Sequence, residues 1–155
     1  MAGIGYDRHR FAGDRRLVLG GIEIEHERGL EGHSDADVLT HAIIDALLGA
    51  AGLGDIGQHF PDTDERYRDA DSLDLLRSVV GMLHGRGLTI GNVDATVIIE
   101  RPGLAPHRER IRAALAEALG LPIERVNVKA TRGERMGFVG REEGAAALAV
   151  ATVSA

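Results

Sequence analysis

The chain has 155 residues, of which 44% are hydrophobic and 27% charged, with a net charge of −6 at pH 7. This composition is typical of one globular domain, which we expect over residues 1–155. Because the chain is negatively charged and only 3% of its residues are aromatic, it lacks the basic, stacking surface that nucleic-acid binding requires. No apolar run approaches the roughly 20 residues of a membrane span, and no basic segment followed by an apolar stretch opens the chain, so we expect a cytoplasmic protein without membrane contact.

The first half of the chain predicts a strand, a hairpin and a helix. Residues 2–10 alternate small or apolar positions with polar ones, which indicates a strand. The apolar runs 17–19 and 22–24 flank two glycines, as in a β-hairpin. A helix is expected over residues 35–51, because its Asp-rich start suits the positive end of a helix dipole.

The second half predicts two helices and three strands. Their expected ranges are Ser72 to Gly85 or Gly87 (helix), 89–100 (strand), Pro106 to Gly120 (helix), 125–131 (strand) and 143–153 (strand). Helices and strands do not alternate strictly, so we expect an α+β fold in which a mixed sheet of four to five strands carries helices on one face. The small residues of the last strand indicate either tight internal packing or a close contact between subunits.

Asp7 and His9 are candidate metal ligands. They stand two residues apart on a predicted strand and therefore point to the same face. The chain has no cysteine, which leaves carboxylate and imidazole groups as ligands for zinc, but the Asp-x-His pair by itself is common. His41 can supply a third ligand, with Asp37 or Asp45 holding its other ring nitrogen. The alternative is that His41 is a buried structural histidine.

Two further segments have the composition of binding loops. Residues 53–64 are rich in Gly, Pro and Asp, which suits either a polyol- or phosphate-binding loop or a turn-rich connector. Residues 127–134 bring Lys, Thr, Arg and Glu to a glycine-containing turn that can bind phosphate and a divalent cation, although no Walker motif is present.

Taken together and in their order along the chain, these motifs resemble those of the 2-C-methyl-D-erythritol 2,4-cyclodiphosphate synthase family. The resemblance covers the chain nearly from end to end. The motifs that carry the resemblance are Gly5-Tyr6-Asp7-x-His9, Gly29-Leu30-x-x-His33-Ser34-Asp35-x-Asp37, His41, Asp45-Ala46-Leu47-Leu48-Gly49-Ala50, Gly54-Asp55-Ile56-Gly57-x-x-Phe60-Pro61-Asp62-Thr63-Asp64, Ala70-Asp71-Ser72, Gly91-Asn92-Val93-Asp94, Asn127-Val128-Lys129-Ala130-Thr131 and Gly137-Phe138-x-Gly140-Arg141-x-Glu143-Gly144.

The resemblance implies a homotrimer around a threefold axis, with active sites between subunits. The implied substrate is 4-diphosphocytidyl-2-C-methyl-D-erythritol 2-phosphate, whose 2-phosphate attacks the β-phosphorus and expels CMP to close a cyclic diphosphate. Such a reaction requires charge neutralisation and in-line positioning more than a protein nucleophile.

The resemblance also implies a role for each matched residue. Zinc would be held by Asp7, His9 and His41, and a second divalent ion, Mg²⁺ or Mn²⁺, by Glu134. The implied catalytic residues are His33 and Arg132. Through the metals or directly, the substrate contacts would be Asp7, His9, His33, Ser34, Asp55, Ile56, Gly57, Phe60, Pro61, Asp62, Thr63, Asp64, Ile99, Pro102, Ala105, Thr131, Arg132, Glu134, Phe138 and Arg141.

Arg132 stands where the family usually has a second threonine, so it either donates to the transferred phosphate or points to solvent. Phe138 and Arg141 match the surroundings of an axial cavity suited to an isoprenoid diphosphate. Two other functions remain open at this stage, a zinc phosphoesterase that activates water and a trimeric isoprenoid diphosphate binder without turnover.

Overall fold

A mixed five-stranded sheet in the order β4-β1-β7-β5-β6 forms one layer of the protein, whose computed structural model describes residues 1–155. The pairs β4-β1, β1-β7 and β7-β5 are antiparallel, whereas β5 and β6 are parallel. This confirms the predicted mixed sheet. The strand bounds are β1 Ala2–Ala12, β4 Gly29–Leu30, β5 Thr89–Ile98, β6 Val126–Thr131 and β7 Gly144–Ser154.

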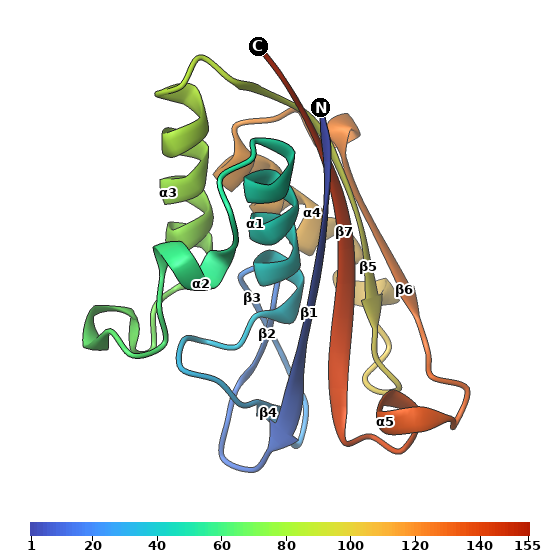
Figure 1. The fold of residues 1–155 in the computed structure, drawn as a ribbon. Helices are drawn as coiled ribbons and strands as arrows, with labels where there is room; N and C mark the ends of the chain where they lie inside the picture. Colours follow the sequence, from blue (N-terminus) through green and yellow to red (C-terminus); the bar gives the residue numbers. More distant parts are fainter.

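Three longer helices pack on one side of this sheet, so the fold is α+β (Figure 1). They are α1 Val38–Ala50, α3 Ser72–His84 and α4 Arg108–Leu119. The remaining helical segments are short: α2 Ile56–His59, η1 Glu65–Tyr67, η2 Ala105–His107, η3 Ile123–Arg125 and α5 Gly137–Gly140. No helix is both long and apolar enough to cross a membrane.

The predicted elements are present, with five differences in their bounds or type. Strand β1 extends to Ala12 rather than residue 10. Helix α1 begins at Val38 rather than near residue 35, because the Asp37 carboxylate accepts from the Thr40 N–H and caps the helix there. Strand β5 ends at Ile98 rather than residue 100. Pro106 lies in the η2 turn before α4 instead of opening that helix. The predicted loop 53–64 contains the four-residue helix α2, which is too short for a periodic apolar signal.

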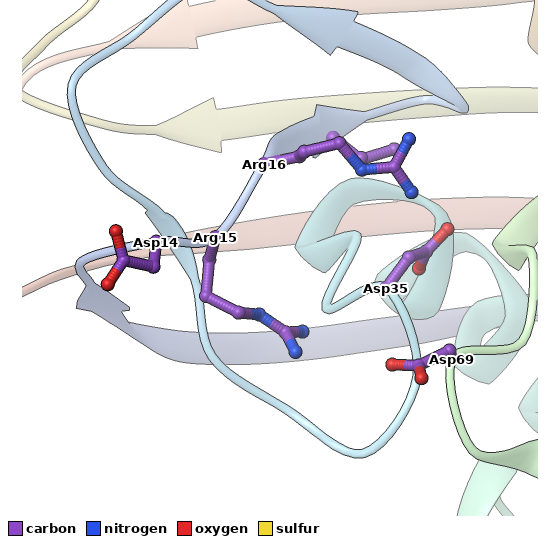
Figure 2. Close-up of a pocket in the computed structure, with 6 residues that line it drawn as sticks. Asp14, Arg15, Arg16, Asp35 and Asp69 are labelled. Carbon is purple, nitrogen blue, oxygen red and sulfur yellow. The ribbon is translucent and has the colours of Figure 1, made fainter.

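The predicted hairpin is present as β2 Leu17–Leu19 and β3 Ile22–Ile24. Gly20 and Gly21 turn it with φ of 60° and 74°, a left-handed conformation that glycine adopts without strain. The connection from β1 to this hairpin lies beside the loop of residues 31–36, and together they border a polar pocket of about 210 Å³ (Figure 2).

The position of strand β7 in the fold explains why its residues are small. Ala145, Ala147, Ala149 and Ala151 are buried on the face that packs against α1, as the internal-packing interpretation predicts. The other face of β7 carries Leu148, which is 40% exposed. None of the three longer helices covers that side of the sheet.

Two glycines bring α1 unusually close to β1. A Cβ atom on Gly5 would lie 1.8 Å from the Ala42 carbonyl oxygen, and one on Gly3 would lie 2.1 Å from that of Ala46. Only glycine permits this approach. Since Gly5 and Asp7 share one face of β1, the same contact brings the next turn of α1 within reach of Asp7.

Candidate active site

Asp7, His9 and His41 come together at the junction of β1 and α1. Oδ2 of Asp7 lies 2.8 Å from Nε2 of His9 and 3.2 Å from Nδ1 of His41, and one ligand atom from each residue lies within 4.8 Å of the others. Opposite Asp7 and His9 on β7 stand Ala147 and Ala145, whose small side chains leave room for the imidazoles. The three predicted ligands therefore converge on one point.

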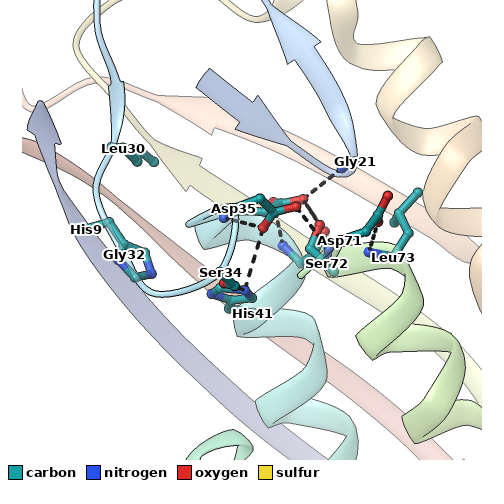
Figure 3. A network of polar contacts seen from close by, with 12 residues as sticks. His9, Gly21, Leu30, Gly32, Ser34, Asp35, His41, Asp71, Ser72 and Leu73 are labelled. Carbon is teal, nitrogen blue, oxygen red and sulfur yellow. Dashed lines mark hydrogen bonds and ion pairs between the residues drawn. The ribbon is translucent and has the colours of Figure 1, made fainter. Parts of the chain in front are cut away.

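The other ring nitrogens of both histidines are held by the loop of residues 31–36. Nδ1 of His9 lies 2.9 Å from the Glu31 carbonyl oxygen, which can only accept, so Nδ1 carries the proton and Nε2 presents its lone pair. Nε2 of His41 lies 3.2 Å from the Ser34 hydroxyl, which accepts equally well (Figure 3). Both rings can then offer a lone pair to a shared cation.

The expected partners of His41, Asp37 or Asp45, were wrong. Asp37 is fully buried and is occupied by the N–H groups of Gly20 and Gly21, the Thr40 N–H and hydroxyl, and the Ser72 hydroxyl. Asp45 accepts from the Ile56 N–H at 2.7 Å. Helical spacing placed these carboxylates on the correct edge of α1, but their partners come from other parts of the chain.

The donor set fits a metal ion. Nε2 of His9 is buried and makes no hydrogen bond, although Oδ2 of Asp7 is only 2.8 Å away. A lone pair that faces a carboxylate oxygen at this distance is repulsive unless a cation or a proton lies between the two atoms. One carboxylate and two imidazoles with an open fourth position are typical of catalytic zinc sites.

The electrostatics of the cluster favour an ionised carboxylate. Burial raises the pKa of Asp7, but the hydrogen bond and charge of His41, together with the nearby His9 ring, outweigh it and bring the pKa to about 2. Burial lowers the pKa of His41, whereas its hydrogen bond to Asp7 and the negative charges of Asp7, Asp37 and Asp35 raise it. The second effect is larger, so the pKa of His41 is raised. In the metal-free protein, His41 therefore holds its proton more tightly than usual.

A cavity of about 400 Å³ opens from this cluster. Ten residues expected at the site line it: Asp7, His9, His33, Ser34, His41, Ile56, Gly57, Phe60, Pro61 and Asp62. It is also lined by Gly32, Tyr67 and Leu75, which sequence reasoning did not identify. Tyr67 packs edge-on against Phe60 with 5.3 Å between ring centroids, a contact that no local pattern predicts.

Three expected contacts lie at the border of this cavity rather than in its lining. Asp55 accepts from the Gln58 N–H and caps α2. Asp64 caps η1, pairs with Arg66 at 2.7 Å, and offers its carbonyl oxygen to Nε2 of His33 at 2.9 Å. Thr63 is exposed between Asp62 and Asp64.

A second group of expected residues surrounds a separate cavity of about 180 Å³ beyond the ends of β5 and β6. It includes Ile99, Pro102, Ala105, Thr131 and Arg132. Strands β7 and β5 lie between β1 and β6, which amounts to roughly 14 Å of sheet at the usual strand spacing. Within one chain, the structure does not bring these residues to the metal cluster.

The remaining expected residues lie near the end of β6 and around α5. Glu134 is exposed in the turn after β6, with a φ of 53°, and is outside the metal cluster of its own chain. Phe138 lines a third cavity, of about 380 Å³, together with Arg8, Arg10 and Glu143. Arg141 forms an ion pair with Glu143 at 3.0 Å. His9 borders both this cavity and the one at the metal cluster.

Fold and site define the class of protein: an α+β protein whose His–Asp cluster, suited to a metal ion, faces an open cavity. The sequence model of the YgbB family matches residues 1–154, and the chain belongs to that family. It is 59% identical over 97% of its length to a 2-C-methyl-D-erythritol 2,4-cyclodiphosphate synthase of Thioalkalivibrio sulfidiphilus, of which it covers 94%.

Solved structures agree with this assignment. The chain superposes on a structure of 2C-methyl-D-erythritol-2,4-cyclodiphosphate synthase with a TM-score of 0.91 at 36% identity, covering 99% of this chain and 100% of that one. It also matches the bifunctional IspDF of Campylobacter jejuni with a TM-score of 0.94 at 41% identity over 98% of its length. The chain spans only 41% of that bifunctional protein.

Proposed function

We propose that this chain is a cyclase of isoprenoid biosynthesis that converts 4-diphosphocytidyl-2-C-methyl-D-erythritol 2-phosphate into 2-C-methyl-D-erythritol 2,4-cyclodiphosphate and CMP. Relatives with that synthase name are 56–59% identical over 97–99% of the chain. The observation that carries the proposal is the convergence of Asp7, His9 and His41 on a cavity that is also lined by His33 and Ser34.

In the reaction, an oxygen of the 2-phosphate forms a bond to the β-phosphorus of the diphosphate. The bond from that phosphorus to the bridging oxygen breaks, and CMP leaves with this oxygen. Both reacting groups are anions, so the protein must neutralise their charge and hold them in line. No protein nucleophile is needed.

Asp7, His9 and His41 would hold a zinc ion at the base of the cavity. When bound, it supplies positive charge and an open coordination position for a phosphate oxygen. Glu31 and Ser34 would keep the two imidazoles turned toward that position through the contacts at 2.9 and 3.2 Å.

The loops around the cavity would bind the rest of the substrate. His33 and Ser34 lie beside the cluster and would contact the attacking phosphate. Asp55 and Gly57 are suited to the erythritol hydroxyls, since a carboxylate and a backbone N–H complement a polyol. Ile56 and the segment from Phe60 to Asp64 would add further substrate contacts. His33 holds this segment beside the cavity through the Asp64 carbonyl.

The second cavity would bind the cytidine monophosphate part. Ile99, Pro102 and Ala105 would surround the cytidine, while Thr131 and Arg132 stand where a diphosphate would enter. Glu134 follows in the next turn and would hold a Mg²⁺ or Mn²⁺ ion together with oxygens of the substrate's diphosphate.

Because the two cavities lie apart in one chain, we propose a homotrimer in which neighbouring subunits complete each site. The face of the sheet opposite α1 supports this arrangement. Ile4, Tyr6, Leu148 and Val150 form an apolar group on adjacent strands there, and they are 70%, 44%, 40% and 45% exposed. A second copy of the chain would remove this group from water.

In such a trimer, Phe138 and Arg141 would stand near the threefold axis and contact an isoprenoid diphosphate. The cavity beside Phe138 supports this, since Arg8 and Arg10 line it and are suited to a diphosphate. This ligand is additional to the cyclase substrate.

Phosphorus NMR on the purified protein tests the proposal. With the cytidyl substrate, Zn²⁺ and Mg²⁺, we expect CMP and a cyclic diphosphate to form together in equal amounts. A linear bisphosphate would instead identify a zinc phosphoesterase, and unchanged substrate would identify a binding protein without turnover.

A further inference from the structure

Arg15 binds the segment that leads from the end of β4 into the loop before α1. It lies in the connection between β1 and β2 and is partly buried. Its Nε donates to the Leu30 carbonyl at 3.1 Å, and its Nη2 donates to the carbonyls of Gly32 and Ser34 at 3.3 and 3.1 Å. In Figure 2 its side chain extends from the connecting segment toward that loop, whereas the neighbouring Arg16 extends in another direction.

The two carbonyl groups between these three have other partners. The Glu31 carbonyl accepts from Nδ1 of His9 at 2.9 Å, and the His33 carbonyl accepts from the Asp69 N–H at 2.9 Å. Successive carbonyls from Leu30 to Ser34 therefore alternate between Arg15 and two other partners, His9 and Asp69.

Four residues of this segment, Glu31 to Ser34, contact the metal cluster or line the cavity beside it. Glu31 sets which nitrogen of His9 carries the proton, and Ser34 contacts Nε2 of His41 at 3.2 Å. His33 and Gly32 line the cavity. A change in the path of residues 30–34 would thus reach both imidazoles of the metal cluster at once.

An arginine is suited to this task for a geometric reason. The planar guanidinium presents five N–H donors in a rigid fork, so one side chain can satisfy several carbonyls without further ordering. A lysine ammonium carries the same charge but presents it as a single point, and it cannot reproduce the fork.

We propose that Arg15 is a positioning residue of the metal centre, acting through the backbone of residues 30–34 to hold His9 and His41 in the geometry that binds the ion. The inference rests on the metal-binding role proposed above for these two histidines. Arg15 itself does not line the cavity at the cluster and need not touch the substrate.

The test compares Arg15→Met with Arg16→Met. Arg16 is the matched control, since it is adjacent, has the same charge, has a side chain 74% exposed and makes only a 3.6 Å contact with Glu23. Zn²⁺ affinity is measured by competition with a chelator, and unfolding of the metal-free protein is followed by circular dichroism. We expect Arg15→Met to bind Zn²⁺ about 10-fold or more weakly, the usual effect of losing an outer partner of a metal site. We expect Arg16→Met to stay within twofold of the parent protein.

Co²⁺ in place of Zn²⁺ reports the geometry of the metal ligands, which would not change if Arg15 only stabilised the fold. The visible absorption of the Co²⁺-loaded protein reports ligand geometry, so we expect its bands to shift in Arg15→Met and to stay unchanged in Arg16→Met. Arg15→Lys, which keeps the charge and most of the packing, should resemble Arg15→Met in both measurements.

Three results would overturn the inference: equal Zn²⁺ affinity and Co²⁺ spectra in the Arg15 and Arg16 variants, full recovery in Arg15→Lys, or failure of both Arg15 variants to fold. None of these measurements requires turnover. If the parent protein binds Zn²⁺ but forms no cyclic diphosphate, the proposed function fails while the positioning role of Arg15 is still decided.

Discussion

Nδ1 of His41 lies 3.2 Å from Oδ2 of Asp7, and this contact joins residues 34 positions apart in the sequence. It connects the first turns of α1 to the middle of β1 at the point where the metal ligands meet.

His41→Ala should remove the metal. We expect bound zinc to fall from about one ion per subunit to nearly none, and turnover to fall by more than about 100-fold, since losing a ligand exceeds the 10–100-fold cost of losing an outer partner. Metal analysis and kinetics measure both. His84→Ala, at the exposed end of α3, is the control. Stoichiometric zinc in His41→Ala would refute the ligand assignment.

Gly5→Ala should separate α1 from β1. The new Cβ would lie 1.8 Å from the Ala42 carbonyl oxygen, so we expect a loss of about 1–3 kcal/mol in the free energy of unfolding and weaker Zn²⁺ binding. Gly49→Ala is the control, because its Cβ meets nothing closer than the Ile4 carbonyl oxygen at 3.9 Å. That helical substitution should be neutral or stabilise by up to about 1 kcal/mol. Equal denaturation midpoints would contradict the close-packing argument.

The metal-free protein should depend on pH in two separate ranges. The pKa of Asp7 falls from its usual 3.8 to about 2, so its contribution of about 2 kcal/mol is present above pH 3.8 and is lost as the pH falls toward 2. The pKa of His41 is raised, so its contribution is complete below pH 6.5 and is lost as the pH rises through the raised pKa.

Zinc should counteract the loss of stability that the metal-free protein shows as the pH rises. Zn²⁺ binds only neutral imidazole, so the stabilisation that it adds should grow as His41 loses its proton. Urea denaturation of metal-free and zinc-loaded protein between pH 5 and 9 measures both effects. In Asp7→Asn, the His41-dependent loss above pH 6.5 should shrink. A metal-free protein of constant stability across this range would show that the ion pair contributes nothing.

Leu148→Asp should dissociate the proposed trimer. Leu148 stands opposite Tyr6 on β1 in the middle of the exposed apolar group, and burying an unpaired carboxylate costs several kcal/mol. We expect monomers by analytical ultracentrifugation and little cyclase activity. Ala113→Asp, at an exposed position of α4 on the helix side of the sheet, should remain trimeric. Unchanged mass in Leu148→Asp would exclude this face as the contact.

Arg132→Ala tests the position at which the chain departs from its family. If the guanidinium contacts the transferred phosphate, kcat should fall about 100-fold, similar to the loss of one oxyanion donor. Arg125→Ala, an exposed arginine just before β6, is the control. Unchanged kinetics would place the Arg132 side chain in solvent.

Mixing Arg132→Ala with His41→Ala then tests whether sites are shared. In randomly mixed trimers, about one quarter of the sites would combine an intact zinc half with an intact Arg132 half from the neighbour. Activity near that fraction, from two variants that are each inactive alone, is the expected result. No recovery would argue that each chain builds its site alone.

Much of this protein is determined by local sequence. Alternation of polar and apolar residues is a property of neighbouring positions, and it was sufficient to predict β1, the hairpin at Gly20 and Gly21, and the shared face of Asp7 and His9. Even there, the cap formed by Asp37 moved the start of α1, because its carboxylate outcompetes further helical turns for the Thr40 N–H.

Only the tertiary structure decided which polar groups meet. Asp37 binds the hairpin turn and α3 instead of His41, Ser34 takes its place beside that imidazole, and Arg15 holds the loop between them. Those partners are separated by 7 to 35 positions, and periodicity carries no information about contacts across such gaps. They are decided by buried polar groups that must each find a partner once the core has formed.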